Sequence, residues 1–114
     1  MMKLKVTEIK NKGTLNQEYV KLKVVEDCNL KYYLLTDTTY ISETSISNKL
    51  RHMYWFSPKD VKKDDVIYIY SGNGTNTSNS GVHKYYWKLS KSVWNDDGDA
   101  ALLFEVNTWK ATRT

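Results

Sequence analysis

The stretch Val93-Trp94-Asn95-Asp96-Asp97-Gly98-Asp99-Ala100-Ala101-Leu102-Leu103 places turn-forming residues between an aromatic residue and an apolar run. Asparagine and aspartate side chains hydrogen-bond their own backbone in turns, and glycine adopts positive φ at no steric cost. Apolar and polar residues that alternate beside such a turn are typical of paired strands. The stretch therefore predicts a β-hairpin in which Trp94 is buried in the core and Gly98 shapes the turn.

Short alternating runs recur along the whole chain of 114 residues, which has one proline and is rich in aromatic residues, nine of them tyrosine and four tryptophan. Aromatic residues favour strands, and no segment keeps a helical period. Apolar residues stand at every second position in residues 4–6, 20–24, 33–35, 67–69, 85–89 and 101–103. Seven or more short strands separated by turn residues predict an all-β fold, an antiparallel β-sandwich.

Residues 1–114 are expected to form a single domain, since the chain has no internal repeat and no linker. A chain of this length buries about two-thirds of its unfolded surface, which suffices for a core without cross-links. Two connections, residues 38–50 and 71–81, are longer than a hairpin needs. The second has no large apolar residue, so we expect it to be a mobile loop.

Cysteine use and the first residues bear on localisation. Cys28 is the only cysteine, so no internal disulfide can form, which suits a reducing compartment. Lys3, Lys5 and Glu8 interrupt the first apolar residues before the apolar segment of a signal peptide could form. As written, the sequence predicts a cytoplasmic protein without a membrane span; a domain excised from a longer protein would instead be compatible with a secreted or cell-surface location.

Four motifs follow one another along the chain: Asn16-x-Glu18-Tyr19-Val20-x-Leu22, Tyr33-x-Leu35-x-Asp37, Ile67-x-Ile69-Tyr70-Ser71-Gly72-x-Gly74 and Val93-Trp94-Asn95-x-x-Gly98-Asp99-x-Ala101-x-Leu103. In this order they resemble the lamin tail domain family over nearly the whole chain. The resemblance implies an immunoglobulin-like β-sandwich and a non-catalytic role. Domains of this family occur in the tails of nuclear lamins and in many bacterial proteins, where they are commonly attached to secreted or membrane-associated hydrolases.

Three positions depart from the pattern of that family. Tyr32-Tyr33 stands where the family tends to have Gly-Trp, and Asp64 or Asp65 stands where it often has glycine. Aspartate tolerates left-handed φ, so the turn before residue 66 remains feasible. Asn107 is expected to replace glycine in the same way, as the turn residue before a final strand through Trp109. These departures preserve the fold but argue against an inherited partner surface.

Candidate metal sites are weak. Asn95, Asp96, Asp97 and Asp99 offer oxygen ligands to Ca²⁺, but they lack the glutamate and spacing of an EF-hand loop. The favoured interpretation is that Asn95 and Asp99 bond backbone amides of the turn, and Ca²⁺ binding stays an open alternative. His52 and His83 have no second histidine or cysteine at ligand spacing, so we expect no metal and no cofactor.

Catalytic motifs are equally weak. Cys28 follows two acidic residues, which would raise the pKa of its thiol and make it a poor nucleophile. No serine stands in a Gly-x-Ser-x-Gly turn, and Gly72-Asn73-Gly74 lacks the lysine and the helix of a phosphate-binding loop. We therefore expect a protein that is not an enzyme. A cleft in which acids and a histidine converge from distant strands would instead indicate an enzyme.

Positive charge is concentrated in the first half of the chain. Residues 1–63 carry 12 lysines and arginines against 7 acidic residues, whereas residues 64–114 carry 5 against 6. Lys21 and Lys23 alternate with inward-facing residues, so they should share an outer sheet face, joined by Lys31 and by Lys3 and Lys5. Lysines also serve simply to keep a sheet face hydrated.

Lys21, Lys23 and Lys31 are the candidate partner-binding residues. The predicted function is protein binding through a sheet face or edge, with an unidentified protein as partner; the alternative is electrostatic binding of nucleic acid.

Overall fold

The computed structural model describes residues 2–94 and 98–114. Extended segments dominate this part of the chain, as expected from its aromatic and β-branched composition. One turn of 3₁₀ helix, η1, interrupts them. In chain order the elements are β1 (Leu4–Lys10), β2 (Tyr19–Val24), β3 (Cys28–Asn29), η1 (Leu30–Tyr32), β4 (Tyr33–Thr39), β5 (Met53–Trp55), β6 (Asp60–Val61), β7 (Val66–Tyr70), β8 (Thr77–Asn79), β9 (Val82–Tyr86) and β10 (Asp99–Glu105).

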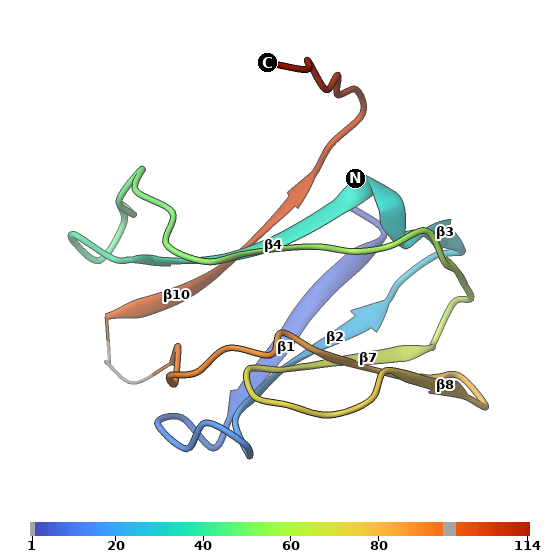
Figure 1. Ribbon diagram of the computed structural model, residues 1–114, viewed down its shortest axis with the longest axis horizontal. Coiled ribbons are helices and arrows are strands. Elements are labelled where there is room, and N and C mark those ends of the chain that lie inside the picture. Colours follow the sequence, from blue (N-terminus) through green and yellow to red (C-terminus); the bar gives the residue numbers. More distant parts are fainter. Residues whose placement is uncertain (1, 95–97) are drawn as a thin grey trace.

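Two sheets form the two layers of a sandwich (Figure 1). A five-stranded sheet has the order β1-β2-β7-β9-β8, and a three-stranded sheet has the order β10-β4-β5; β3 and β6 pair separately. The predicted all-β sandwich is confirmed. One pair departs from the antiparallel expectation, because β7 and β9 run parallel. Strand β8 takes the outer edge, and the turn at Ser80-Gly81 returns the chain as β9 into the place beside β7.

The core lies between the sheets and includes Trp94, as predicted. Its indole is fully buried against the inward side chains of both layers. Leu103, whose place in the alternating run of residues 101–103 predicts an inward side chain, is only partly buried. Burying an aliphatic or aromatic side chain of this size contributes about 1.5–3 kcal/mol. The fully buried neighbours expected from the alternation are Val20, Leu22, Leu35, Ile67 and Ile69.

The predicted hairpin around residues 93–103 is wrong. β10 pairs along its whole length with β4, from Asp99 opposite Thr39 to Glu105 opposite Tyr33. The preceding strand, β9, belongs to the other sheet. The chain therefore passes from one layer to the other between β9 and β10. Asn95, Asp96 and Asp97, the predicted turn residues, lie outside the described residues. Among the described glycines only Gly13 and Gly81 have positive φ, so Gly98 does not need that freedom.

Other expectations need correction at strand ends. Within the described residues no strand follows β10, so the final strand through Trp109 is absent, and Asn107 does not have positive φ. β9 ends at Tyr86, before the alternation at Trp87 and Leu89. The connection of residues 71–81, expected as a loop, contains β8.

Asp64 does adopt left-handed φ, at 75°, as its place before β7 predicts. No helix in the described part of the chain is long and apolar enough to cross a membrane.

Candidate functional site

Glu18 is a fully buried carboxylate that joins three segments, and its role was not predicted from the sequence. Its Oε2 accepts hydrogen bonds from the Ser71 hydroxyl, the Val93 N–H at 2.7 Å and the Trp94 N–H at 3.4 Å. Its Oε1 accepts from the Gly13 N–H at 3.1 Å. A buried charge is tolerated only when it is hydrogen-bonded in this way. Glu18 therefore connects the loop before β2, the end of β7 and the crossing between the sheets, and its role is structural.

His83 lies between an acid and a hydroxyl. Its Nε2 is 2.9 Å from Asp65 Oδ2, and its Nδ1 is 2.8 Å from Ser78 Oγ. The hydrogen bond with His83, and then that with the Lys62 N–H, lowers the pKa of the Asp65 carboxyl. An ionised carboxylate can only accept, so Nε2 carries a proton, and in the neutral imidazole Nδ1 accepts from Ser78.

This Ser-His-Asp chain contains the residue types of an acyl-transfer triad. In this fold it connects the three-residue edge strand β8 to the turn before β7, because Ser78 lies on β8 and Asp65 on that turn. The histidine is buried, whereas Ser78 is exposed at the sheet edge. The contacts add a side-chain link between β8 and the turn before β7. Ser78 is the residue whose replacement tests for hydrolytic activity.

Asp37 on β4 and Asp99 on the neighbouring strand β10 both interact with residues 51–52. Asp37 Oδ1 accepts from the His52 N–H at 2.8 Å, and Arg51 approaches Asp99 at 3.3 Å. Asp99, one of the proposed Ca²⁺ ligands, is therefore engaged by a guanidinium; Asn95, Asp96 and Asp97 lie outside the described residues. Within residues 2–94 and 98–114, no group of three or more His, Cys, Asp or Glu side chains could hold a metal ion. Ca²⁺ binding stays a prediction.

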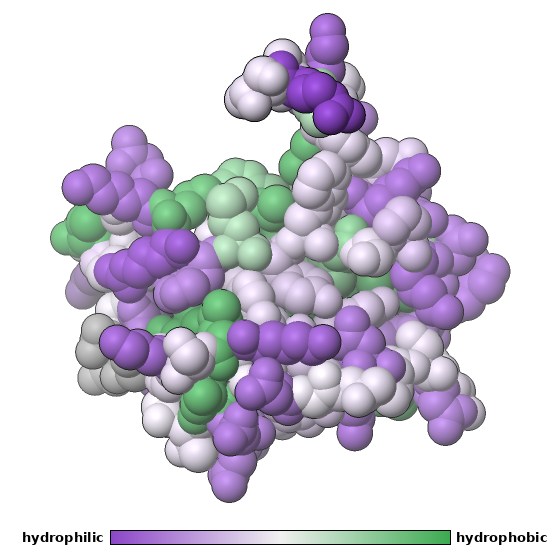
Figure 2. Space-filling model, in the orientation of Figure 1, coloured by the Kyte–Doolittle hydropathy of each residue, from purple (hydrophilic) through white to green (hydrophobic). Residues whose placement is uncertain are grey.

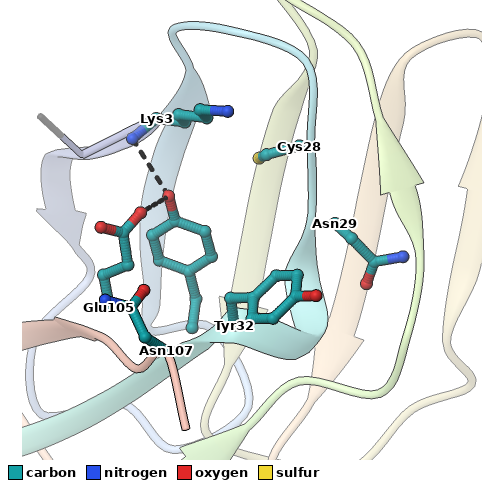
Figure 3. A pocket seen from close by; sticks show the side chains of 7 residues that line it. Lys3, Cys28, Asn29, Tyr32, Glu105 and Asn107 are labelled. Atoms are coloured by element: carbon teal, nitrogen blue, oxygen red, sulfur yellow. Dashed lines mark hydrogen bonds between the residues drawn. The ribbon is translucent and has the colours of Figure 1, made fainter.

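A cleft of about 240 Å³ lies where the start of β1 and the end of β10 meet the β3–η1 segment (Figure 3). The Tyr33 hydroxyl donates to Glu105 Oε2 at 2.7 Å and accepts from the Lys3 backbone N–H at 3.1 Å. Burial and the bond to Glu105 raise the pKa of Tyr33. Burial is also the main cause that raises the pKa of the Cys28 thiol, with nearby acids adding to it. A neutral thiol is a poor nucleophile, so this raised pKa works against nucleophilic attack by Cys28.

The candidate lysines fall on different surfaces. Lys21 and Lys23 lie on the outer face of the five-stranded sheet, as predicted, and Lys5 is the cross-strand neighbour of Lys23. Lys23 also approaches Asp64 at 3.7 Å. Lys31 lies in η1, where its ammonium is 5.1 Å from the ring centre of Tyr32. Lys3 lines the cleft of Figure 3.

Apolar residues occupy much of the outer face of the three-stranded sheet. Phe104, Leu34 and Trp55 form one row across β10, β4 and β5, and in the next row Leu102 and Met53 lie on either side of the buried Thr36. We call the five apolar residues the apolar face. Met53, Trp55 and Phe104 are 55%, 51% and 36% exposed. Figure 2 shows hydrophobic residues at the surface between hydrophilic ones in the view that looks onto β4 and β10.

The segment after β10 extends this surface. Trp109 packs perpendicular to Trp55, with ring centres 5.0 Å apart, and it also contacts the Tyr32 ring. The Trp55 indole N–H donates to the Lys31 carbonyl at 2.8 Å, which fixes the ring at the sheet edge. Trp55, Trp109 and Pro58 border a cleft of about 370 Å³. A cleft bordered by exposed tryptophans suits an apolar side chain of a partner.

Strand β10 is an edge strand with few features that would block pairing. It is seven residues long, keeps regular register with β4 and contains neither lysine nor proline. The equally long edge strand β1 has a register shift between Val6 and Glu8 and carries three lysines when Lys3 is counted with it. Bulges and charges are the usual protection of a sheet edge. β10 is therefore the more open template for a further strand.

No protein-family model matches the chain, and no curated protein matches it.

Proposed function

We propose that this chain is a non-catalytic recognition module that binds a protein through the three-stranded sheet. The observation that carries the proposal is the open edge of β10 beside the half-exposed apolar face. Exposed contiguous apolar surface marks interaction sites, and tryptophan is enriched among the residues that contribute most to binding. The surface combines both properties with an unpaired strand edge.

The mode that fits this surface is strand addition. Tyr40 N–H donates to the Gly98 carbonyl, and Val106 N–H donates to the Tyr32 carbonyl. Hydrogen-bonded positions alternate in an antiparallel pair, so the even-numbered residues of β10 face β4, whereas Ala101 and Leu103 direct N–H and C=O groups outward. An extended partner segment can pair with those groups and place alternate side chains beside Leu102 and Phe104.

The resemblance to lamin tail domains supports the same role, because that family is non-catalytic and immunoglobulin-like. We also propose that the chain belongs to this family, that residues 1–114 form a single domain, and that the protein is cytoplasmic. If the chain is a domain of a longer secreted or cell-surface protein, the same surface would bring a partner to whatever activity the rest of that protein carries.

The proposal is tested by selecting binders from a random peptide library against the intact chain. We expect extended peptides with alternating apolar residues. Ala101→Pro should weaken their binding at least about tenfold, because it removes an outward N–H without breaking a bond to β4. Phe104→Asp should weaken binding similarly by placing a charge on the apolar face.

The matched control is Lys84→Ala, an exposed change on the other sheet, and thermal melts show whether each variant is folded. The proposal is wrong if folded Ala101→Pro and Phe104→Asp bind the selected peptides as tightly as the parent. It is also wrong if repeated selections return no peptide.

A further inference from the structure

Four tyrosines form a continuous strip across the outer face of the five-stranded sheet. Tyr19 on β2 is opposite Tyr70 on β7, and Tyr70 is opposite Tyr86 on β9. Tyr68 completes the strip, with its ring centre 5.2 Å from that of Tyr19. The rings of Tyr70 and Tyr86 are 5.1 Å apart and nearly parallel, at 14°. All four side chains are half-buried, so each ring is fixed by its neighbours and still reaches solvent.

Lysines border this strip on several sides. Lys10 is the cross-strand neighbour of Tyr19, and Tyr68 lies between Lys21 and Lys84. The Lys21 ammonium is 5.7 Å from the ring centre of Tyr68. Lys5 and Lys23 lie in the next row, where Asp64 partly offsets the charge of Lys23. Glu8, the neighbour of Lys21, is the acid that β1 contributes to this sheet. Positive charge therefore exceeds negative charge on the face, which we call the tyrosine–lysine face.

We propose that the tyrosine–lysine face binds single-stranded nucleic acid. Every base can stack on an aromatic ring, and lysines at the border of such a platform neutralise the phosphates. Solubility alone accounts for the lysines, but it does not account for four adjacent rings on a solvent-facing sheet. Neighbouring strands are about 4.8 Å apart, so the strip from Tyr19 to Tyr86 spans about 10 Å. That length suits a few unpaired nucleotides, whereas a duplex keeps its bases away from the rings.

This site is independent of the proposed protein-binding surface, because it lies on the outer face of the other sheet. A failure of one proposal therefore leaves the other intact. The variants distinguish the two proposals. Phe104→Asp changes the apolar face and should leave the binding of nucleic acid unchanged, whereas changes at Tyr68 and Lys84 should leave the binding of a peptide to β10 unchanged.

The test measures fluorescence anisotropy of a labelled oligouridylate of about 12 nucleotides, a length within known single-strand footprints. We expect binding at low salt that weakens steeply as salt rises. Tyr68→Leu, which keeps an apolar side chain but removes the ring, should weaken binding about tenfold, the usual loss for one stacked base. Lys21→Glu with Lys84→Glu should weaken it further and flatten the salt dependence.

Tyr40→Leu and Lys59→Glu serve as matched controls, because both residues are exposed and lie outside this face. Heparin is the competing probe for a purely electrostatic surface. The proposal is overturned if no binding is measurable at low salt. It is equally overturned if folded Tyr68→Leu binds the oligonucleotide like the parent, or if Lys59→Glu weakens binding as much as the change at Lys21 and Lys84.

Discussion

Replacing Glu18 should show how strongly one buried carboxylate stabilises the junction of three segments. Its oxygens accept from the Ser71 hydroxyl and from the N–H groups of Val93, Trp94 and Gly13. Hydrogen bonds to a charged group are worth about 1.5–3 kcal/mol each, and each buried donor left without an acceptor costs about 1–3 kcal/mol. Glu18→Ala should therefore cost at least about 4 kcal/mol, a large share of the 5–15 kcal/mol typical of a domain.

Glu18→Gln gives the sharper measurement. Glutamine keeps one carbonyl oxygen, which can serve Ser71 and Val93, but its amide group then faces the Gly13 N–H, donor against donor. We expect a loss of about 1.5–3 kcal/mol in urea unfolding followed by tryptophan fluorescence. Glu43→Gln, an exposed change of the same chemistry, should stay within about 0.5 kcal/mol of the parent. Equal urea midpoints for Glu18→Gln and Glu43→Gln would refute the reasoning.

Four further predictions concern stability and chemistry. Trp94→Ala should cost about 3–5 kcal/mol in thermal or urea unfolding, and a melting temperature within a degree or two of the parent would contradict its place in the core. The pKa of Asp65 is lowered by folding, so its stabilising contribution is present above about pH 4 and is lost as the pH falls through the lowered value. In urea midpoints measured from pH 2 to 6, Asp65→Asn should lack the loss of stability that protonation of Asp65 causes in the parent. A pH profile identical to that of the parent would exclude this contribution of Asp65. Millimolar Ca²⁺ should leave the melting temperature unchanged, whereas saturation a hundredfold above the Kd would add about 2.7 kcal/mol that EDTA reverses. Nitrophenyl acetate should be hydrolysed no faster by the parent than by Ser78→Ala, and a burst of nitrophenol lost in that variant would establish an acyl-enzyme.

The longer strands were predictable from the sequence because each buries one face. Alternation in β2 and β7 placed Val20, Leu22, Ile67 and Ile69 inward, and the structure buries all of them. The same alternation placed Lys21 outward. β3, β6 and β8 were not predictable, since two or three residues carry no period. Their positions depend on contacts with distant segments, such as Asn29 accepting from the Lys59 N–H.

The candidate surfaces were harder to predict, because they depend on register between strands far apart in the chain. Tyr68 and Tyr70 stand two positions apart, but Tyr19 and Tyr86 join them only through the pairing of β2 and β9 with β7. The parallel pairing of β9 has no local signature. Likewise, the turn residues around Gly98 fit a hairpin and a crossing equally well, and the choice depends on where β10 finds its partner.

The Tyr33 hydroxyl links the start of β1 to the end of β10. It bonds the backbone at Lys3 on one side and the Glu105 carboxylate on the other, and Figure 1 shows both termini leaving at the same end of the sandwich. Domains with adjacent ends tolerate circular permutation and insertion into another protein. A short glycine linker from the end of β10 to Lys3 should therefore yield a permuted chain that folds when it is reopened elsewhere. In a larger polypeptide, such a domain can occupy the tip of a host loop without forcing the flanking segments apart.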